Sequence, residues 1–456
     1  MQDLTQGSVI RHLLGMAAFM VVSMAVQTLY LLADLYWVGR LGREAIAAVG
    51  VAGNLMMVVL ALTQTLAVGT TTLIAQAAGR KDQAHAERAF NQATTMSLLI
   101  GFAFCVVGLL LREAYSNALS ADGATAQLSS IYLAWFIPAL ALQFPLTALT
   151  SALRATGIIK PAMLVQVLSV VLNIVFAPLL IFGIGPWPAL GVSGAALATF
   201  ISVLIADVVM VIYVEKRYRY LRFRVAQLAP QMKVWWSMLK IRLPAGAEFV
   251  LLSIYVAVVY AMIRPFGAAA QAGFGIGARV MQAMFLPVVA LSFAISPVVG
   301  QNFGGRRADR VRQAVTAAIG LASAMMLVLT IVTWLAAPRM IGAFSSDPGV
   351  IAFGSEYLTI VALNYVAAGI AFSSSSVFQG IGNTVPPLLS SASRLLLFVL
   401  PATLLARTPG FHIRHVWYLS VASQVIQACL NLLLLRREMR RKLNFHEVPI
   451  SGATPG

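Results

Sequence analysis

Asp34 is the residue of this sequence whose type and position most clearly point to chemistry. Its carboxylate ends a run from Leu13 to Ala33 that contains no charged side chain. Such a carboxylate is either a solvated residue at a helix end or a buried group, and burying an unpaired charge is costly. Tyr30 precedes Asp34 by four positions and therefore shares its helix face. A buried carboxyl group at this position can carry a proton or hold a cation.

A few other charged residues interrupt apolar runs. Glu248 follows Pro244 by four positions, so it either couples to an ion or satisfies backbone groups that the proline leaves unpaired. Asp207 is interpreted as a polar contact between helices or an interfacial residue. Arg279 and Arg394 are interpreted as pairing with acids or carbonyls of their half of the chain, although Arg394 alternatively faces a cytoplasmic vestibule. No phosphate-binding loop, metal-ligand cluster or nucleophile–base spacing is present, so we predict neither an enzyme nor a metal or cofactor site.

The elements that position these residues are membrane-spanning helices. The chain has 456 residues, of which 60% are hydrophobic and only 10% charged, whereas soluble domains carry roughly 25% charged residues. Apolar runs of about 20 residues recur along the whole chain, and each can cross a bilayer as a helix. We predict an all-α integral membrane protein with twelve transmembrane helices. Asp34 lies roughly 9 Å of helix before Arg40, which places it inside the outer leaflet.

The charge of +17 is explained by membrane topology and not by nucleic-acid binding. Of the 32 Lys and Arg residues, 23 fall in segments on the face that holds both termini, and seven fall on the opposite face. By the positive-inside rule, both termini are cytoplasmic. We therefore expect a multi-pass protein of the bacterial inner membrane that contacts lipids and binds no nucleic acid.

The two halves of the sequence repeat each other. Gln76 matches Gln301 and Gly157 matches Gly382, and the two pairs have the same separation in residue number, which we call the repeat spacing. One constant spacing over five spans predicts two parallel six-helix repeats around a central cleft, related by an axis along the membrane normal. The predicted parts are an N-terminal lobe (1–215), a basic cytoplasmic linker (216–235), a C-terminal lobe (236–440) and a disordered cytoplasmic tail (441–456). The linker either lies on the anionic membrane surface or is a plain charged connection.

The chain resembles the multidrug and toxic compound extrusion (MATE) family from Arg11 to about Arg437. Six motifs carry the resemblance in the family's order: LYLLADLYWVGRLGREAIAAVG (Leu29–Gly50), LRATGIIKP (Leu153–Pro161), LNIVFAPLLIFG (Leu172–Gly183), GVSGAALATFIS (Gly191–Ser202), LPAGAE (Leu243–Glu248) and FQGIGNTVPPLL (Phe378–Leu389). The family implies a secondary antiporter that expels cationic or amphipathic compounds, driven by protons or sodium ions.

The bacterial DinF-like branch is the nearer match, and it implies that Asp34 is the coupling residue. It also implies a substrate or coupling pocket formed by Tyr30, Tyr132, Asn173 and Thr199. The branch often has a second acid where this chain has Ala177, which weakens the case for a sodium site. It usually has a proline where this chain has Phe19, so a helix bend at that proline is not expected. Glu248 is a possible second coupling residue in the C-terminal lobe.

The function predicted from these features is export of organic cations or drugs in exchange for protons, or for sodium, by alternating access. The alternative is a flippase of the same superfamily that moves lipids or lipid-linked saccharides. Flippases tend to have extra helices and a strongly cationic cleft, and neither is visible in this sequence. We expect a monomer that needs no cofactor besides its coupling ion.

Overall fold

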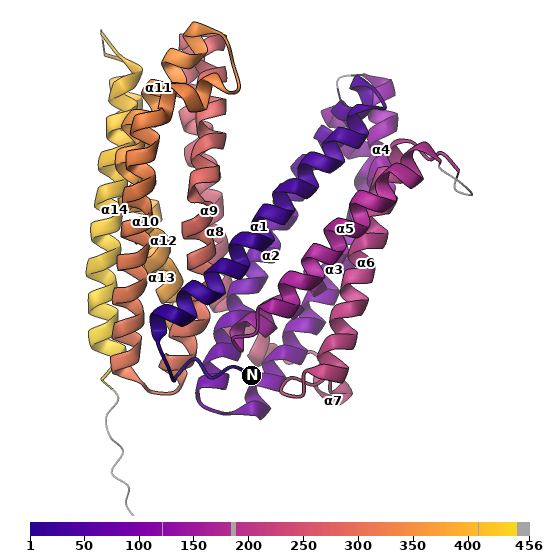
Figure 1. Ribbon diagram of the computed structural model, residues 1–456, viewed down its shortest axis with the longest axis vertical. Helices are drawn as coiled ribbons and strands as arrows, with labels where there is room; N and C mark the ends of the chain where they lie inside the picture. The colour runs from indigo at the N-terminus through magenta and orange to yellow at the C-terminus, as the bar shows by residue number, and fades with distance from the viewer. Residues whose placement is uncertain (121, 184–187, 409, 445–456) are drawn as a thin grey trace, which may run out of the picture.

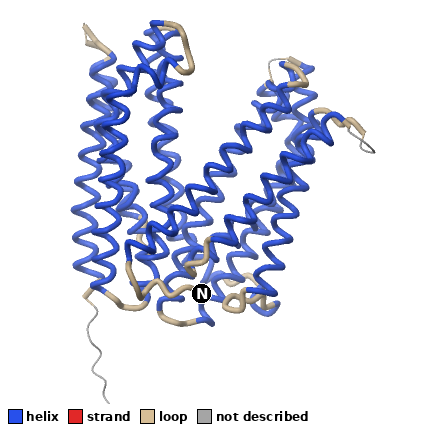
Figure 2. Tube along the Cα trace, in the orientation of Figure 1, coloured by secondary structure: helices blue, strands red, loops and turns tan. Residues whose placement is uncertain are grey.

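The structure is a computed structural model that describes residues 1–120, 122–183, 188–408 and 410–444. All regular elements in these ranges are helical (Figure 2), and they supply twelve segments long and apolar enough to cross a membrane. The spanning segments are α1 (Val9–Gly39), α2 (Arg43–Gly79), α3 (Gln83–Leu119), α4 (Gly123–Ala155), α5 (Lys160–Phe182), α6 (Val192–Arg217), α8 (Met232–Ile263) with η1 (Arg264–Phe266), α9 (Ala268–Gly304), α10 (Ala308–Gly342), α11 (Pro348–Val361) with η2 (Ala362–Asn364) and α12 (Tyr365–Ile381), α13 (Val385–Leu405) and α14 (Ile413–Lys442).

The helices form two groups, which we call the N lobe (α1–α6) and the C lobe (α8–α14). Figure 1 shows the lobes diverging toward one end of the molecule and meeting at the other, where the N-terminus and the end of α14 lie. We call this second end the terminal end. The helix starts repeat between the lobes, because α2, α3, α4 and α5 begin one repeat spacing before α9, α10, α11 and α13, respectively.

The lobes pack against each other through their first two helices. In the N lobe, α1 packs against α9, and α2 packs against both α8 and α9. The closest crossing lies at the terminal end, where α2 and α9 meet at Gly79 and Gly304. A Cβ atom added to Gly79 would overlap the backbone of Gln301, and one added to Gly304 would overlap the backbone of Gln76. Glycine is required at both positions because the two backbones approach too closely for any side chain.

The N-terminal segment lies across this crossing and contacts both lobes. The Gln2 amide donates to the carbonyl of Thr156 in the N lobe at 2.9 Å. The Leu4 amide donates to Gln301 Oε1 at 3.0 Å, and Asn302 Nδ2 donates to the Leu4 carbonyl at 3.1 Å, both in the C lobe. The Leu4 side chain is fully buried. These bonds tie the segment to the closed end of the molecule.

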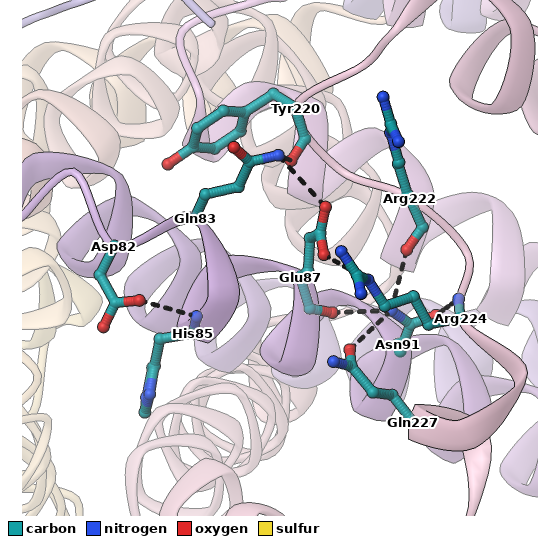
Figure 3. Close-up of polar contacts among 9 residues, drawn as sticks. All are labelled: Asp82, Gln83, His85, Glu87, Asn91, Tyr220, Arg222, Arg224 and Gln227. Atoms are coloured by element: carbon teal, nitrogen blue, oxygen red, sulfur yellow. Dashed lines mark hydrogen bonds and ion pairs between the residues drawn. The ribbon is translucent and has the colours of Figure 1, made fainter.

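The linker between the lobes contains the short helix α7 (Val225–Leu228) and is tied to α3 by polar contacts (Figure 3). Glu87, whose side chain is 2% exposed, accepts from Arg224 Nε at 2.7 Å. Asn91 Nδ2 donates to the Arg222 carbonyl at 2.9 Å, and Asn91 Oδ1 accepts from the Arg224 amide at 3.1 Å. The linker is therefore packed on the N lobe along these residues.

Two spanning segments show local features that bear on the sequence analysis. The tenth segment, Pro348–Ile381, is interrupted by the 3₁₀ turn η2, whereas α1 is one uninterrupted helix with Phe19 in place of a proline. At the carboxyl end, α14 continues to Lys442. The rest of the expected tail, from 445 onward, lies outside the described residues.

Candidate functional site

The N lobe contains a cavity of about 250 Å³. Its walls come from α1, α2, α4, α5 and α6, with Phe293 of α9 reaching it from the C lobe. Tyr30, Asn173 and Thr199, for which the family resemblance implies one pocket, all line it. Among the described residues that line the cavity there is no Asp or Glu, and the charged group is Arg154.

A hydrogen-bond network centred on Thr199 joins these three residues. Asn173 Nδ2 donates to Thr199 Oγ1 at 3.1 Å, and Tyr30 Oη lies 3.2 Å from the same oxygen. The Thr199 hydroxyl lies 3.2 Å from the carbonyl of Ala195, one turn earlier in α6, and donates to it. Because a threonine hydroxyl has one hydrogen to give, Tyr30 is the donor in its bond to Thr199. The network fixes α1, α5 and α6 relative to one another at the cavity wall.

Asp34 lies one turn beyond Tyr30 on α1 and is buried, with 8% of its surface exposed. It is not among the residues that line the cavity. Asp34 Oδ1 has no hydrogen-bond partner among the described residues. A buried carboxylate without a partner is stable only if it gains a proton or a cation.

Tyr132 is placed differently from the other expected pocket residues. Its side chain is 1% exposed, it does not line the cavity, and its ring packs on Phe136 with the centroids 4.8 Å apart. Ala177, at the position where a second acid was considered, is fully buried. The structure thus brings Tyr30, Asn173 and Thr199 together at a cavity, with Asp34 one turn away and Tyr132 in the packed interior.

Glu248 lies outside this region, in a second cavity of about 130 Å³ within the C lobe. Helices α8, α12, α13 and α14 form its walls, which also carry Tyr255 and Arg394. The Arg394 guanidinium carbon lies 4.6 Å from the centroid of the Tyr255 ring. Among the residues that the structure describes, neither Glu248 nor Arg394 takes part in an ion pair. The expected pairing of Arg394 with an acid is therefore not formed.

Two further charged residues of the spanning helices, Asp207 and Arg279, line neither of the two cavities. Asp207 is 8% exposed, and both of its carboxylate oxygens lack hydrogen-bond partners among the described residues, so the expected contact between helices is not made. Arg279 is exposed on α9. Sequence reasoning missed Arg154 as a cavity residue, since its position at the end of α4 resembles that of an ordinary helix-end cation.

Comparison with known proteins points to one family over most of the chain. The family model described as MatE matches residues 20–179 and 244–404. A protein of Shewanella oneidensis named "FAD transporter" is 26% identical over 371 residues, covering 81% of this chain and 82% of the relative. The "Probable multidrug resistance protein YoeA" of Bacillus subtilis is 26% identical over 413 residues, covering 88% of this chain and 89% of the relative.

A solved structure described as the outward-facing conformation of a multidrug resistance MATE family transporter of the MOP superfamily is also similar. It superposes with a TM-score of 0.87 at 25% identity, covering 96% of this chain and 98% of that one. The likeness extends over both lobes.

Proposed function

Because the chain belongs to the MATE family, we propose that this multi-pass membrane protein exports organic cations or amphipathic drugs in exchange for protons, with Asp34 as the proton carrier. The observation that carries the proposal is the burial of Asp34 one turn from Tyr30, with no described residue bonded to Oδ1. Relatives named as multidrug resistance or export proteins support small-molecule export.

Proton exchange at Asp34 provides a way to couple the two fluxes. An ionised Asp34 attracts a cationic substrate into the N lobe, whereas a protonated Asp34 does not. Protonation also turns the carboxyl group into a donor, which changes the bonds available to Tyr30 and the Thr199 network. One proton taken up on the outer side would then release one drug, and loss of that proton on the inner side would reset the site.

The arrangement of the lobes supports alternating access. The lobes diverge at one end and meet at the terminal end, where the glycine crossing and the N-terminal segment close the gap. If the terminal end is cytoplasmic, as the distribution of Lys and Arg predicts, this conformation faces outward. Rocking of the lobes would open the terminal end and bring Asp34 into contact with the cytoplasm.

The orientation has its own test. Reporter fusions after Asp122 and Asp347 should report the periplasm of a bacterial host, and fusions after Lys81 and Arg307 the cytoplasm. Finding Asp122 and Arg307 on one side would contradict the proposed orientation of the lobes in the inner membrane. We propose that the exporter works there as a monomer, which size analysis of the purified protein would check.

Transport by Asp34→Asn tests the coupling role. Purified protein in liposomes should expel a cationic dye after a pH jump, and Asp34→Asn should lose most of this activity while keeping its fold. Dye efflux after a sodium jump at constant pH shows whether sodium, and not the proton, drives transport. Asp207→Asn is the matched control, because Asp207 is equally buried in the same lobe and lines neither cavity. Full proton-driven efflux by Asp34→Asn would eliminate the proposed carrier.

A second candidate function is export of an anionic aromatic compound. One relative is named an FAD transporter, and FAD carries a pyrophosphate. An arginine lines each cavity, Arg154 in the N lobe and Arg394 in the C lobe. Inhibition of dye efflux by added FAD, at concentrations where the cationic dye is not saturating, would favour this candidate.

A further inference from the structure

The two cavities are copies of one site. Of the twelve residues that line the C-lobe cavity in the described part of the chain, all but Leu251 lie one repeat spacing after a residue that lines the N-lobe cavity. Tyr30 corresponds to Tyr255, and Thr199 corresponds to Gln424. Because these correspondences follow the internal repeat, the same helix faces line a cavity in both lobes. The C-lobe cavity is thus a repeat-related counterpart of the candidate site and not an accidental packing defect.

The two repeat-related cavities differ in the charged residues that line them. Positions held by Ser23 and Ser169 in the N-lobe cavity are held by Glu248 and Arg394 in the C lobe. In the opposite sense, the counterpart of Asp34 is Val259, which is 1% exposed. The N lobe therefore has the carboxylate of Asp34 near its cavity but not in its walls, whereas the C-lobe cavity has a carboxylate and a guanidinium group in its walls.

Arg394 is held in place by an aromatic ring, but one of its nitrogen atoms lacks a hydrogen-bond partner among the described residues. Its guanidinium group rests on the ring of Tyr255, whose hydroxyl lies 2.6 Å from Ser420 Oγ. Arg394 Nε is buried and has no hydrogen-bond partner in the part of the chain that the structure describes. Gln427 Nε2 donates to Ser391 Oγ at 2.9 Å, so these neighbouring polar groups bond to each other. Arg394 Nε therefore lacks a partner in the cavity wall, and a solute group that enters the cavity meets the same guanidinium group.

We propose that the C-lobe cavity binds an amphoteric aromatic solute, whose carboxylate contacts Arg394 and whose cationic group lies near Glu248. A planar guanidinium group binds a carboxylate through two parallel hydrogen bonds. Leu251, Phe372 and Leu395 give the cavity apolar walls for an aromatic body. Two partly buried opposite charges that do not pair with each other are costly, and a solute carrying both charges offsets that cost. The proposal extends the proposed export function to a second site and substrate class.

The test uses two dyes that differ in one group. Rhodamine B carries a free carboxylate and a cationic xanthene, and its ethyl ester is a cation only. Binding of each dye to the purified full-length protein in detergent is measured by fluorescence polarisation. Arg394→Gln should weaken rhodamine B binding by about tenfold or more, as expected for the loss of a charge-assisted hydrogen bond, and should change binding of the ester less than about twofold. Glu248→Gln should weaken binding of both dyes.

Controls separate this result from damage to the fold. Arg339→Gln removes an exposed arginine of the same lobe and should bind both dyes like the wild type. Arg394→Lys keeps the charge and should lie between wild type and Arg394→Gln, and unfolding temperatures identify any variant that misfolds. Equal effects of Arg394→Gln on the two dyes, or no effect on either, would overturn the proposal. Since binding is measured without a proton gradient, failure of coupling through Asp34 would leave this result unaffected.

Discussion

The Leu4 amide and the side chain of Gln301 form a hydrogen bond of 3.0 Å that lies between the two lobes. Gln301 is fully buried at the α2–α9 crossing, and its Nε2 also donates to the carbonyl of Ala155 at 2.9 Å. One C-lobe side chain thereby holds both the N-terminal segment and the end of α4. Because Gln301 of the C lobe bonds to Ala155 of the N lobe, and the N-terminal segment bonds to both lobes, separating the lobes at the terminal end would break bonds in this cluster.

Replacing Gln301 should favour opening of the terminal end. Gln301→Ala leaves the Leu4 amide and the Ala155 carbonyl without their partners in the closed state, at a cost of about 1–3 kcal/mol for each buried group. Spin labels at residues 160 and 306, in a background with both cysteines replaced, should report longer distances between the lobes. Gln271→Ala, at an exposed position of the same helix, is the control. Unchanged distances in Gln301→Ala would mean that these bonds do not keep the lobes closed.

The glycine crossing should tolerate no side chain. Gly79→Ala forces the α2 and α9 backbones apart, because its Cβ atom overlaps the Gln301 backbone, and overpacking of this kind costs about 1–3 kcal/mol or more. Gly320→Ala is the matched control, since a Cβ atom there meets nothing within 4 Å. We expect a lower unfolding temperature for Gly79→Ala than for Gly320→Ala in detergent. Equal temperatures would show that the crossing adjusts freely.

The Thr199 network predicts a difference between two similar substitutions. Thr199→Val removes the oxygen that accepts from Asn173 and Tyr30, leaving two donors unpaired at a cost of about 1–3 kcal/mol each. Thr199→Ser keeps that oxygen. Thr199→Val should therefore lower both the unfolding temperature and dye efflux, and Thr199→Ser should resemble the wild type. Identical behaviour of the two variants would exclude a role for the hydroxyl.

Glu87 should hold the linker against α3. Glu87→Ala removes the buried acceptor of Arg224 Nε and also the Gln83 contact at 3.2 Å. Hydrogen exchange of residues 218–231 should then become faster, because this segment loses an anchor to the N lobe. Glu113→Ala, on the same helix with its side chain 74% exposed, should leave that exchange unchanged. Slow exchange in both variants would assign the anchoring to Asn91 instead.

Much of the architecture could be predicted because it depends on patterns along the chain. Apolar runs predict spanning helices however those helices pack against one another. The constant repeat spacing predicts that helices start at matching positions in the two lobes. The position of Asp34 relative to Tyr30 follows from helix geometry alone. The bonds of Asn173 and Tyr30 to Thr199 required the structure, since they join three helices whose rotations the sequence does not specify.

The arrangement of side chains at the two cavities depends on which face of each helix turns inward. Tyr132 and Asn173 were expected in one pocket, but packing of α4 directs Tyr132 into the interior and leaves Asn173 on the cavity wall. The sequence does not distinguish Arg394 from a structural ion-pair residue. Whether an acid reaches it depends on residues far from it along the chain, and none of those that the structure describes does so. The spans, the repeat and the position of Asp34 can be predicted without coordinates, because these are properties of order and spacing along the chain. The cavity in each lobe cannot be predicted in this way, because a cavity is the space that several packed helices leave between them.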